Sequence, residues 1–73
     1  MQALSTTHQR LGEKIKSLRS DLRLTQEDLA DLVGVDRSYM GFIERGEKNP
    51  TLKNIEKIAN ALKVSLSELF HDI

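Results

Sequence analysis

Three consecutive polar side chains, Arg37, Ser38 and Tyr39, form the group in this sequence best suited to chemistry, and that chemistry is binding. An arginine presents parallel N–H donors that match O6 and N7 of a guanine, or two oxygens of a phosphate. A serine hydroxyl can bond to either, and a tyrosine adds a flat ring and a second hydroxyl. The residue types therefore point to recognition of a polar or anionic surface such as nucleic acid.

Catalysis and metal binding are both disfavoured by the remaining polar residues. The chain has no cysteine, and its two histidines, His8 and His71, lie near opposite ends. We find no nucleophile–base pair, no glycine-rich phosphate loop and no cluster with the spacing of metal ligands. We expect a protein that is not an enzyme and that uses no cofactor and no metal ion.

The composition is that of a small polar chain. Its 73 residues suffice for one domain, 1–73, of which we expect residues 1–7 to be flexible. Hydrophobic residues make up 38% and charged residues 30%, and the N-terminus lacks the pattern of a secretory signal. We therefore expect a cytoplasmic protein without a membrane partner. Eleven basic and eleven acidic residues cancel, but the basic ones concentrate in 1–24 and 37–53.

Apolar residues recur at helical spacing along almost the whole chain. Leu11, Ile15, Leu18 and Leu22 follow one another at i, i+4, i+7 and i+11, which predicts a helix from about His8 to Leu22. No segment shows the alternation of a half-buried strand, so the predicted fold class is all-α with five helices. The other four helices are expected to begin at the N-capping residues Thr25, Asp36, Thr51 and Ser65, and to span about 25–33, 37–45, 51–62 and 65–73.

The second and third of these helices meet at a tight turn. Gly34 can adopt the left-handed conformation that ends a helix, and Asp36 can begin the next one two residues later. Two short helices joined in this way have the geometry of a helix-turn-helix, here at about 25–45. We expect Met40 and Ile43 to face inward from the second helix of this pair.

The stretch TQEDLADLVGVDRSYMGFIERG, followed by NPT, resembles a known family. Its pattern is similar to the XRE/Cro-like, phage-repressor type of helix-turn-helix, over about residues 8–70. The segments 36–39 and 43–46 are further similar to the controller proteins of restriction-modification systems, which are small dimeric regulators. The resemblance implies a five-helix, lambda-repressor-like DNA-binding domain whose second motif helix, 36–45, lies in the major groove.

The resemblance also implies roles for individual residues. Arg37, Ser38 and Tyr39 would contact base edges or phosphates from the start of the recognition helix. Gln26 matches a glutamine that spans a phosphate and the recognition helix, and Lys48 and Asn49 match positions that reach the DNA backbone or the edge of the site. Arg45 and Lys53 are weaker candidates for phosphate contacts.

Two further sets of residues have structural roles in the family. Arg19 and Glu44 occupy the places of a partly buried salt bridge that ties the first helix to the third. Leu69, Phe70 and Ile73 are expected to contribute to a dimer interface, with Leu66 and Leu69 turned inward and Phe70 and Ile73 outward. The alternative for these three residues is a C-terminal helix that only completes the core.

We therefore predict a sequence-specific regulator of transcription that binds an inverted-repeat DNA operator as a homodimer and responds to no small-molecule effector. A phage repressor, an antitoxin-type autoregulator, and a protein-interaction module that keeps the fold stay open as alternatives. The role of Phe42 stays open too, between an exposed base contact and packing against another subunit. Gly41, in mid-helix, indicates that something approaches closely there.

Overall fold

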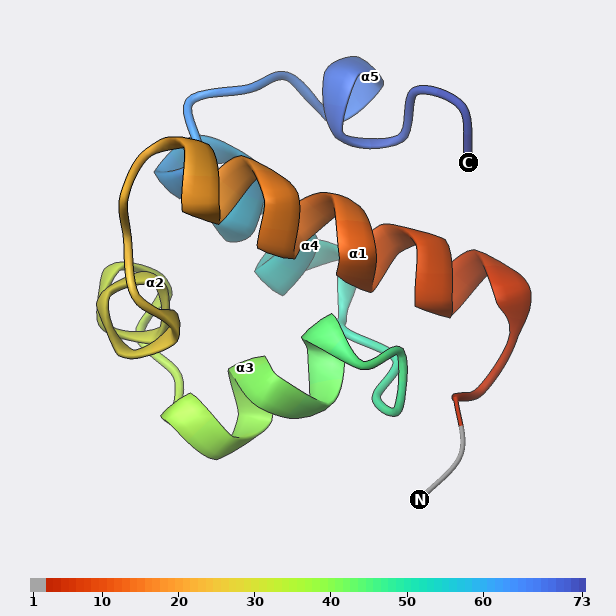
Figure 1. Ribbon diagram of the computed structural model, residues 1–73, viewed down its shortest axis with the longest axis horizontal. Coiled ribbons are helices and arrows are strands. Elements are labelled where there is room, and N and C mark those ends of the chain that lie inside the picture. Colours follow the sequence, from red (N-terminus) through yellow and green to blue (C-terminus); the bar gives the residue numbers. More distant parts are fainter. Residues whose placement is uncertain (1–2) are drawn as a thin grey trace.

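The computed structural model describes residues 3–73 and contains five helices in this part of the chain, with α1 lying between α5 and α3 (Figure 1). The chain is all-α over these residues, as predicted. The helices are α1 (Thr6–Asp21), α2 (Gln26–Val33), α3 (Arg37–Glu44), α4 (Leu52–Ala61) and α5 (Leu66–Leu69).

Side-chain caps set most of the helix starts. Thr25 and Ser65 each form a capping box, in which the hydroxyl accepts from the backbone N–H three residues later and an acidic side chain accepts from the cap's own N–H. Thr51 accepts from the Asn54 N–H at 3.1 Å. Asp36 stands at the predicted N-cap of α3 but makes no side-chain capping bond, so the start of α3 depends on tertiary packing instead.

The helix at the N-terminus begins earlier than expected. Helix α1 begins at Thr6, two residues before the predicted start, because the Ser5 hydroxyl accepts from the His8 N–H at 3.2 Å. The backbone N–H of Leu4 donates to the carbonyl of Gly46 at 2.7 Å. The flexibility predicted for 1–7 stays a prediction, although this bond and the early start of α1 give the segment from Leu4 onward defined contacts. Residues 1 and 2 lie outside the described part of the chain.

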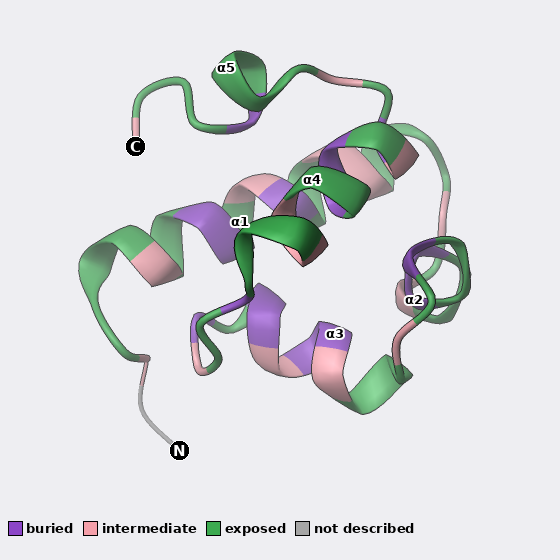
Figure 2. Cartoon of the chain, turned by 180° about the vertical axis from the view of Figure 1, so that it is seen from behind, coloured by how far each residue is buried: buried purple, intermediate pink, exposed green. Residues whose placement is uncertain are grey.

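All five helices contribute to one hydrophobic core, and their buried faces turn toward it (Figure 2). Of the stripe predicted for α1, Leu11 and Ile15 belong to this core and Leu18 packs against it, but Leu22 is 40% exposed because it follows the last residue of the helix. Met40 and Ile43 of α3 are both buried, as predicted. The residues of this cluster are Leu11, Ile15, Leu29, Ala30, Val33, Met40, Ile43, Ile58, Ala59, Leu62 and Leu69.

Two glycines orient α3, one through a left-handed turn and the other through a close approach of two helices. Gly34 has φ 85°, the left-handed conformation predicted for it, and its N–H donates to the Ala30 carbonyl at 2.8 Å. Gly12 lies where α1 crosses α3, and a Cβ there would collide with the backbone carbonyl oxygens of Ile43 and Glu44. The turn at Gly34 sets the direction of α3, and the contact at Gly12 sets how closely α3 packs against α1.

Candidate nucleic-acid interface

One side of α3 faces away from the core. Met40 and Ile43 are buried beneath the helix, whereas Arg37 and Ser38 are exposed at its first turn (Figure 2). With 3.6 residues per turn, positions 37, 38, 41, 42 and 45 share the outward side. This side is the surface that α3 can offer to a binding partner.

A shallow hollow runs along this outward side and is closed by the start of α2. Gln26 from α2 lines it together with Arg37, Ser38, Gly41, Phe42 and Arg45 from α3 and its C-cap. A Cβ on Gly41 would lie 3.2 Å from Arg45 Nη1 and 3.3 Å from Gln26 Oε1. The close approach inferred at Gly41 is therefore made by side chains of the protein itself.

A buried carboxylate holds the two walls of the hollow together. Glu44 is 7% exposed, and its two oxygens accept from Arg19 Nε at 2.8 Å and Arg19 Nη2 at 3.0 Å. Glu44 Oε1 also accepts from Gln26 Nε2 at 3.1 Å. The hydrogen bonds that Arg19 donates to Glu44 raise the pKa of Arg19 above its ordinary value. Helices α1, α2 and α3 are thus joined at a single acidic side chain.

Gln26 has the position that the sequence predicts for it. It is the first residue of α2, half-buried, with its amide engaged by the last residue of α3. The first N–H groups of a helix have no partner within the helix and point outward along its axis. Gln26 therefore connects α3 to a helix end that can accept an anion.

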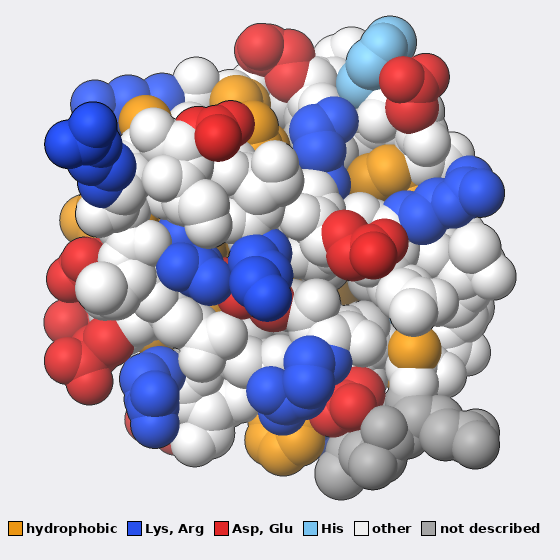
Figure 3. Space-filling model, in the orientation of Figure 1, with side chains coloured by type: hydrophobic (Ala, Val, Ile, Leu, Met, Phe, Trp, Pro, Cys, Tyr) orange, Lys and Arg blue, Asp and Glu red, His pale blue; other side chains and the backbone are white. Residues whose placement is uncertain are grey.

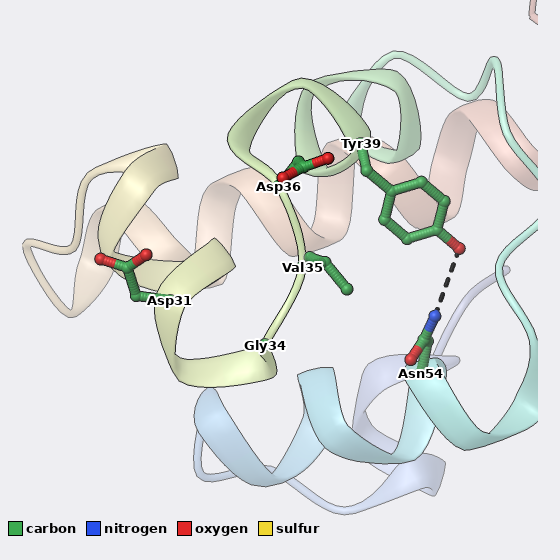
Figure 4. A pocket seen from close by; sticks show the side chains of 6 residues that line it. All are labelled: Asp31, Gly34, Val35, Asp36, Tyr39 and Asn54. Atoms are coloured by element: carbon green, nitrogen blue, oxygen red, sulfur yellow. Dashed lines mark hydrogen bonds between the residues drawn. The ribbon is translucent and has the colours of Figure 1, made fainter.

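Tyr39 lies apart from this hollow. Its half-buried ring packs against the core, and its hydroxyl accepts from Asn54 Nδ2 of α4 at 3.3 Å (Figure 4). It lines a second hollow in which the carboxylates of Asp31 and Asp36 also stand. Met40 and Ile43 face inward as predicted, and the ring of Tyr39 packs against the core beside them.

The loop after α3 brings its side chains back toward the helix. Gly46 has φ 74° and packs against the backbone of Gln9, so the chain reverses there. Lys48 and Asn49 follow, both exposed, and Lys48 Nζ lies 5.7 Å from the centre of the Phe42 ring. The loop residues predicted from sequence thus lie beside the outward side of α3.

Charge is unevenly distributed around this site. In Figure 3, basic side chains lie across the middle and lower part of the face, over α1 and α3, with some acidic ones among them, and a group of acidic side chains stands at the left edge, over α2. The two basic segments recognised in the sequence therefore share a face although the net charge of the chain is zero. Such a local positive field attracts an anionic polymer without requiring a basic protein.

Comparison with known proteins agrees with this geometry. The model of the helix-turn-helix family matches residues 15–69. The chain is 46% identical over 65 residues to the control protein C.MunI of a Mycoplasma species, covering 88% of each chain. The chain belongs to the helix-turn-helix family. As a helix-turn-helix protein it is a DNA-binding regulator and not an enzyme, which confirms the predicted class.

Further relatives extend the comparison. The crystal structure of the restriction-modification controller protein C.AhdI from Aeromonas hydrophila superposes with a TM-score of 0.87 at 44% identity, covering 90% of this chain and 100% of that one. The immunity repressor of Bacillus phage phi105 is 39% identical over 81% of this chain and 41% of its own length. The lambda-repressor-like fold of this helix-turn-helix protein is therefore confirmed.

The C-terminal residues of the helix-turn-helix protein differ from expectation. Leu69 is 0% exposed and belongs to the core, so its inward orientation is as predicted and it offers no exposed surface to a second subunit. Leu66, expected inward, is 38% exposed, and Phe70 one turn later is 37% exposed. Ile73 is half-buried against the core. The exposed apolar pair of this segment is therefore Leu66 on α5 and Phe70 at its C-cap.

Two residues, Arg45 and Asn54, make contacts in the structure that the local sequence pattern does not indicate. Arg45 was only a weaker phosphate candidate, although its guanidinium lies against Gly41 and Gln26 in the hollow. Asn54 was not singled out, because a polar residue on the following helix carries no local signal of its bond to Tyr39. Within residues 3–73, three or more potential metal ligands gather nowhere, and no helix is long and apolar enough to cross a membrane.

Proposed function

We propose that this protein binds an inverted-repeat DNA operator as a homodimer and regulates transcription there. The observation that carries the proposal is the exposed first turn of α3, where Arg37 and Ser38 stand beside Gln26 at the rim of one hollow. In helix-turn-helix complexes the N-terminal residues of this helix meet base edges in the major groove. The side chains available here suit that contact.

Each residue has a distinct task in this proposal. Arg37 binds a guanine through O6 and N7, and Ser38 bonds to a neighbouring base or phosphate. Gln26, Lys48 and Asn49 contact the backbone, with Gln26 at the N-terminus of α2, where N–H groups favour a phosphate. Tyr39 contacts the DNA at the flank of α3 and not within the hollow, because it lines a separate hollow and its hydroxyl accepts from Asn54.

Dimerisation is the second part of the proposal. Leu66 on α5 and Phe70 at its C-cap, one helical turn apart, expose two large apolar side chains, and Ile73 follows three residues later, half-buried. A two-fold interface that covers these residues would place two recognition helices about 34 Å apart, in successive major grooves. The operator would then have half-sites about one helical turn apart.

The genes under control follow from the relatives. We infer that the protein is the controller of a restriction-modification system, because it is 46% identical to the control protein C.MunI over 88% of both chains. The match to the phage repressor is lower and spans less than half of that protein, which makes phage immunity the weaker assignment. As a DNA-binding regulator it would act in the cytoplasm, on its own promoter.

Selection from a random pool of duplexes at about 0.15 M salt tests operator binding, because non-specific phosphate binding is weak there. We expect an enriched inverted repeat, and sedimentation should show a dimer on it. Lys57→Ala, which removes an exposed charge from α4, is the matched control for Arg37→Ala and should select the same operator as the wild type. Absence of enrichment with folded, dimeric protein would refute the proposal. Neighbouring methyltransferase and endonuclease genes would distinguish a controller from a phage repressor.

A further inference from the structure

Phe42 stands on the outward side of α3 with two cations against its ring. Arg45 Cζ lies 5.1 Å and Lys48 Nζ 5.7 Å from the ring centre, both within the range of a cation–π interaction. The ring is half-buried and lines the same hollow as Gln26 and Arg37.

Two glycines make this arrangement possible. Gly41 leaves space on α3 that the guanidinium of Arg45 fills, since a Cβ there would lie 3.2 Å from Arg45 Nη1. Gly46 turns the chain with φ 74°, and the Glu47 N–H donates to the Phe42 carbonyl at 2.8 Å. The loop is therefore bonded to the residue that carries the ring, and Lys48 follows directly.

The two cations keep groups free to bind an anion. Arg45 donates from Nε to Glu47 Oε1 at 3.2 Å, which orients the guanidinium, and its side chain stays 55% exposed. Lys48 is exposed and contacts the ring only through its charged end. Long basic side chains lose rotamer freedom when they bind, so holding them in place beforehand lowers the cost of binding.

We propose that Phe42 is a positioning residue, whose ring holds Arg45 and Lys48 in the orientation that binds the DNA phosphates. The proposal rests on the operator binding proposed above. In it, the ring affects DNA binding only by orienting Arg45 and Lys48. A direct contact with a thymine methyl would need a free ring, but here two cations occupy positions over it. Phosphate contacts position a protein without reading sequence, so the effect of the ring is the same at every site.

Replacement of the ring tests this. Phe42→Leu keeps an apolar side chain of helix-forming type, and Phe42→Tyr keeps the aromatic face. We expect Phe42→Leu to weaken binding about three- to tenfold, equally on the selected operator and on each single-base variant of it, and Phe42→Tyr to restore the affinity. Leu32→Ala, which removes an exposed apolar side chain from α2, is the matched control. Far-UV circular dichroism and Tm verify that all variants fold.

A second comparison separates positioning from direct contact. In a background with Arg45→Gln and Lys48→Gln, Phe42→Leu should have no further effect, because the ring has no cation left to hold. A loss confined to one base pair, or a loss that persists in the neutral background, would overturn the proposal. So would unchanged affinity of Phe42→Leu.

The free protein gives a readout that does not need DNA. Aromatic ring currents should shift the Arg45 and Lys48 side-chain protons upfield in NMR spectra of the wild type, and Phe42→Leu should abolish the shift. Unshifted protons would overturn the positioning by the ring even if operator binding holds. If the wild type selects no operator although the shifts are present, the proposed function fails and the role toward phosphates fails with it.

Discussion

Arg19 and Glu44 form a two-pronged ion pair between α1 and the end of α3, with Nε–Oε2 at 2.8 Å and Nη2–Oε1 at 3.0 Å. Their side chains are 12% and 3% exposed. Arg19 also donates from Nη1 to the Leu24 carbonyl at 2.9 Å, in the segment between α1 and α2. The geometry of the helix-turn-helix thus depends on a pair of residues that lie outside its turn.

Removal of the carboxylate should destabilise the whole domain. Glu44→Ala leaves the guanidinium of Arg19 largely buried without its counter-charge, and also deprives Gln26 of its acceptor. We expect the free energy of unfolding to fall by about 3–5 kcal/mol, measured by urea denaturation. Glu56→Ala, on the exposed side of α4, should change it by less than about 0.5 kcal/mol. Equal effects of the two substitutions would contradict the structural role of Glu44.

The contact at Gly12 predicts a second stability effect. A Cβ at Gly12 meets the backbone carbonyls of Ile43 and Glu44, which cannot move without shifting α3. Gly12→Ala should therefore cost about 1–3 kcal/mol or more in unfolding experiments. Gly34→Ala is the informative comparison, since nothing lies within 4 Å of its Cβ and only the left-handed φ of 85° opposes it, at about 1–2 kcal/mol. A tolerated Gly12→Ala would mean that α1 and α3 are further apart than described.

The capping carboxylates predict a dependence on pH. The backbone N–H of Thr25 lowers the pKa of Asp28, and that of Ser65 lowers the pKa of Glu68, from ordinary values of 3.8 and 4.5. A carboxylate with a depressed pKa stabilises the fold above its unfolded pKa, and that stability disappears as the pH falls through the folded pKa. Tm should therefore drop as the pH falls below these ordinary values.

Asp28→Asn should make that drop shallower. Asp31→Asn is the matched control, because Asp31 is exposed on the same helix but caps nothing. Thermal melts between neutral and acidic pH provide the measurement. A slope unchanged by Asp28→Asn would show that the capping bond does not contribute.

Variants of Arg37 and Lys48 should distinguish contacts with bases from contacts with phosphates. Arg37→Ala should cost about 1–3 kcal/mol on the operator and relax the preference at one base pair in each half-site. Lys48→Ala should weaken binding to all sequences alike and reduce the slope of log K against log salt by about one. Binding titrations over a salt series measure both. A uniform loss with Arg37→Ala would assign this residue to the backbone instead.

Substitutions at the adjacent residues Leu69 and Phe70 should have different effects, one on stability and the other on the oligomeric state. Phe70→Asp places a charge on the exposed surface of α5 and should convert the dimer to a folded monomer in sedimentation velocity. Leu69→Ala empties a fully buried position and should lower stability by about 2–5 kcal/mol. Leu32→Asp, on the exposed side of α2, should leave the oligomeric state unchanged. A dimer that persists with Phe70→Asp would place the interface elsewhere.

The sequence by itself determined the local features of this protein. The caps at Thr25 and Ser65, the left-handed turn at Gly34 and the apolar stripes along the helices are as predicted, except that Leu22 lies outside the core. These features depend on contacts within about one helical turn, so residue type and spacing are sufficient. The exposure of Arg37 and Ser38 follows from the same periodicity.

Tertiary structure decided which of the outward and inward residues meet. Leu69 rather than Leu66 enters the core, Tyr39 bonds to Asn54, and Arg45 lies across Gly41. Each of these outcomes depends on how far one helix is rotated against another, or on a side chain finding space that a neighbour leaves open. Local spacing does not encode such relations, because they arise only when helices that are distant in sequence pack around one core.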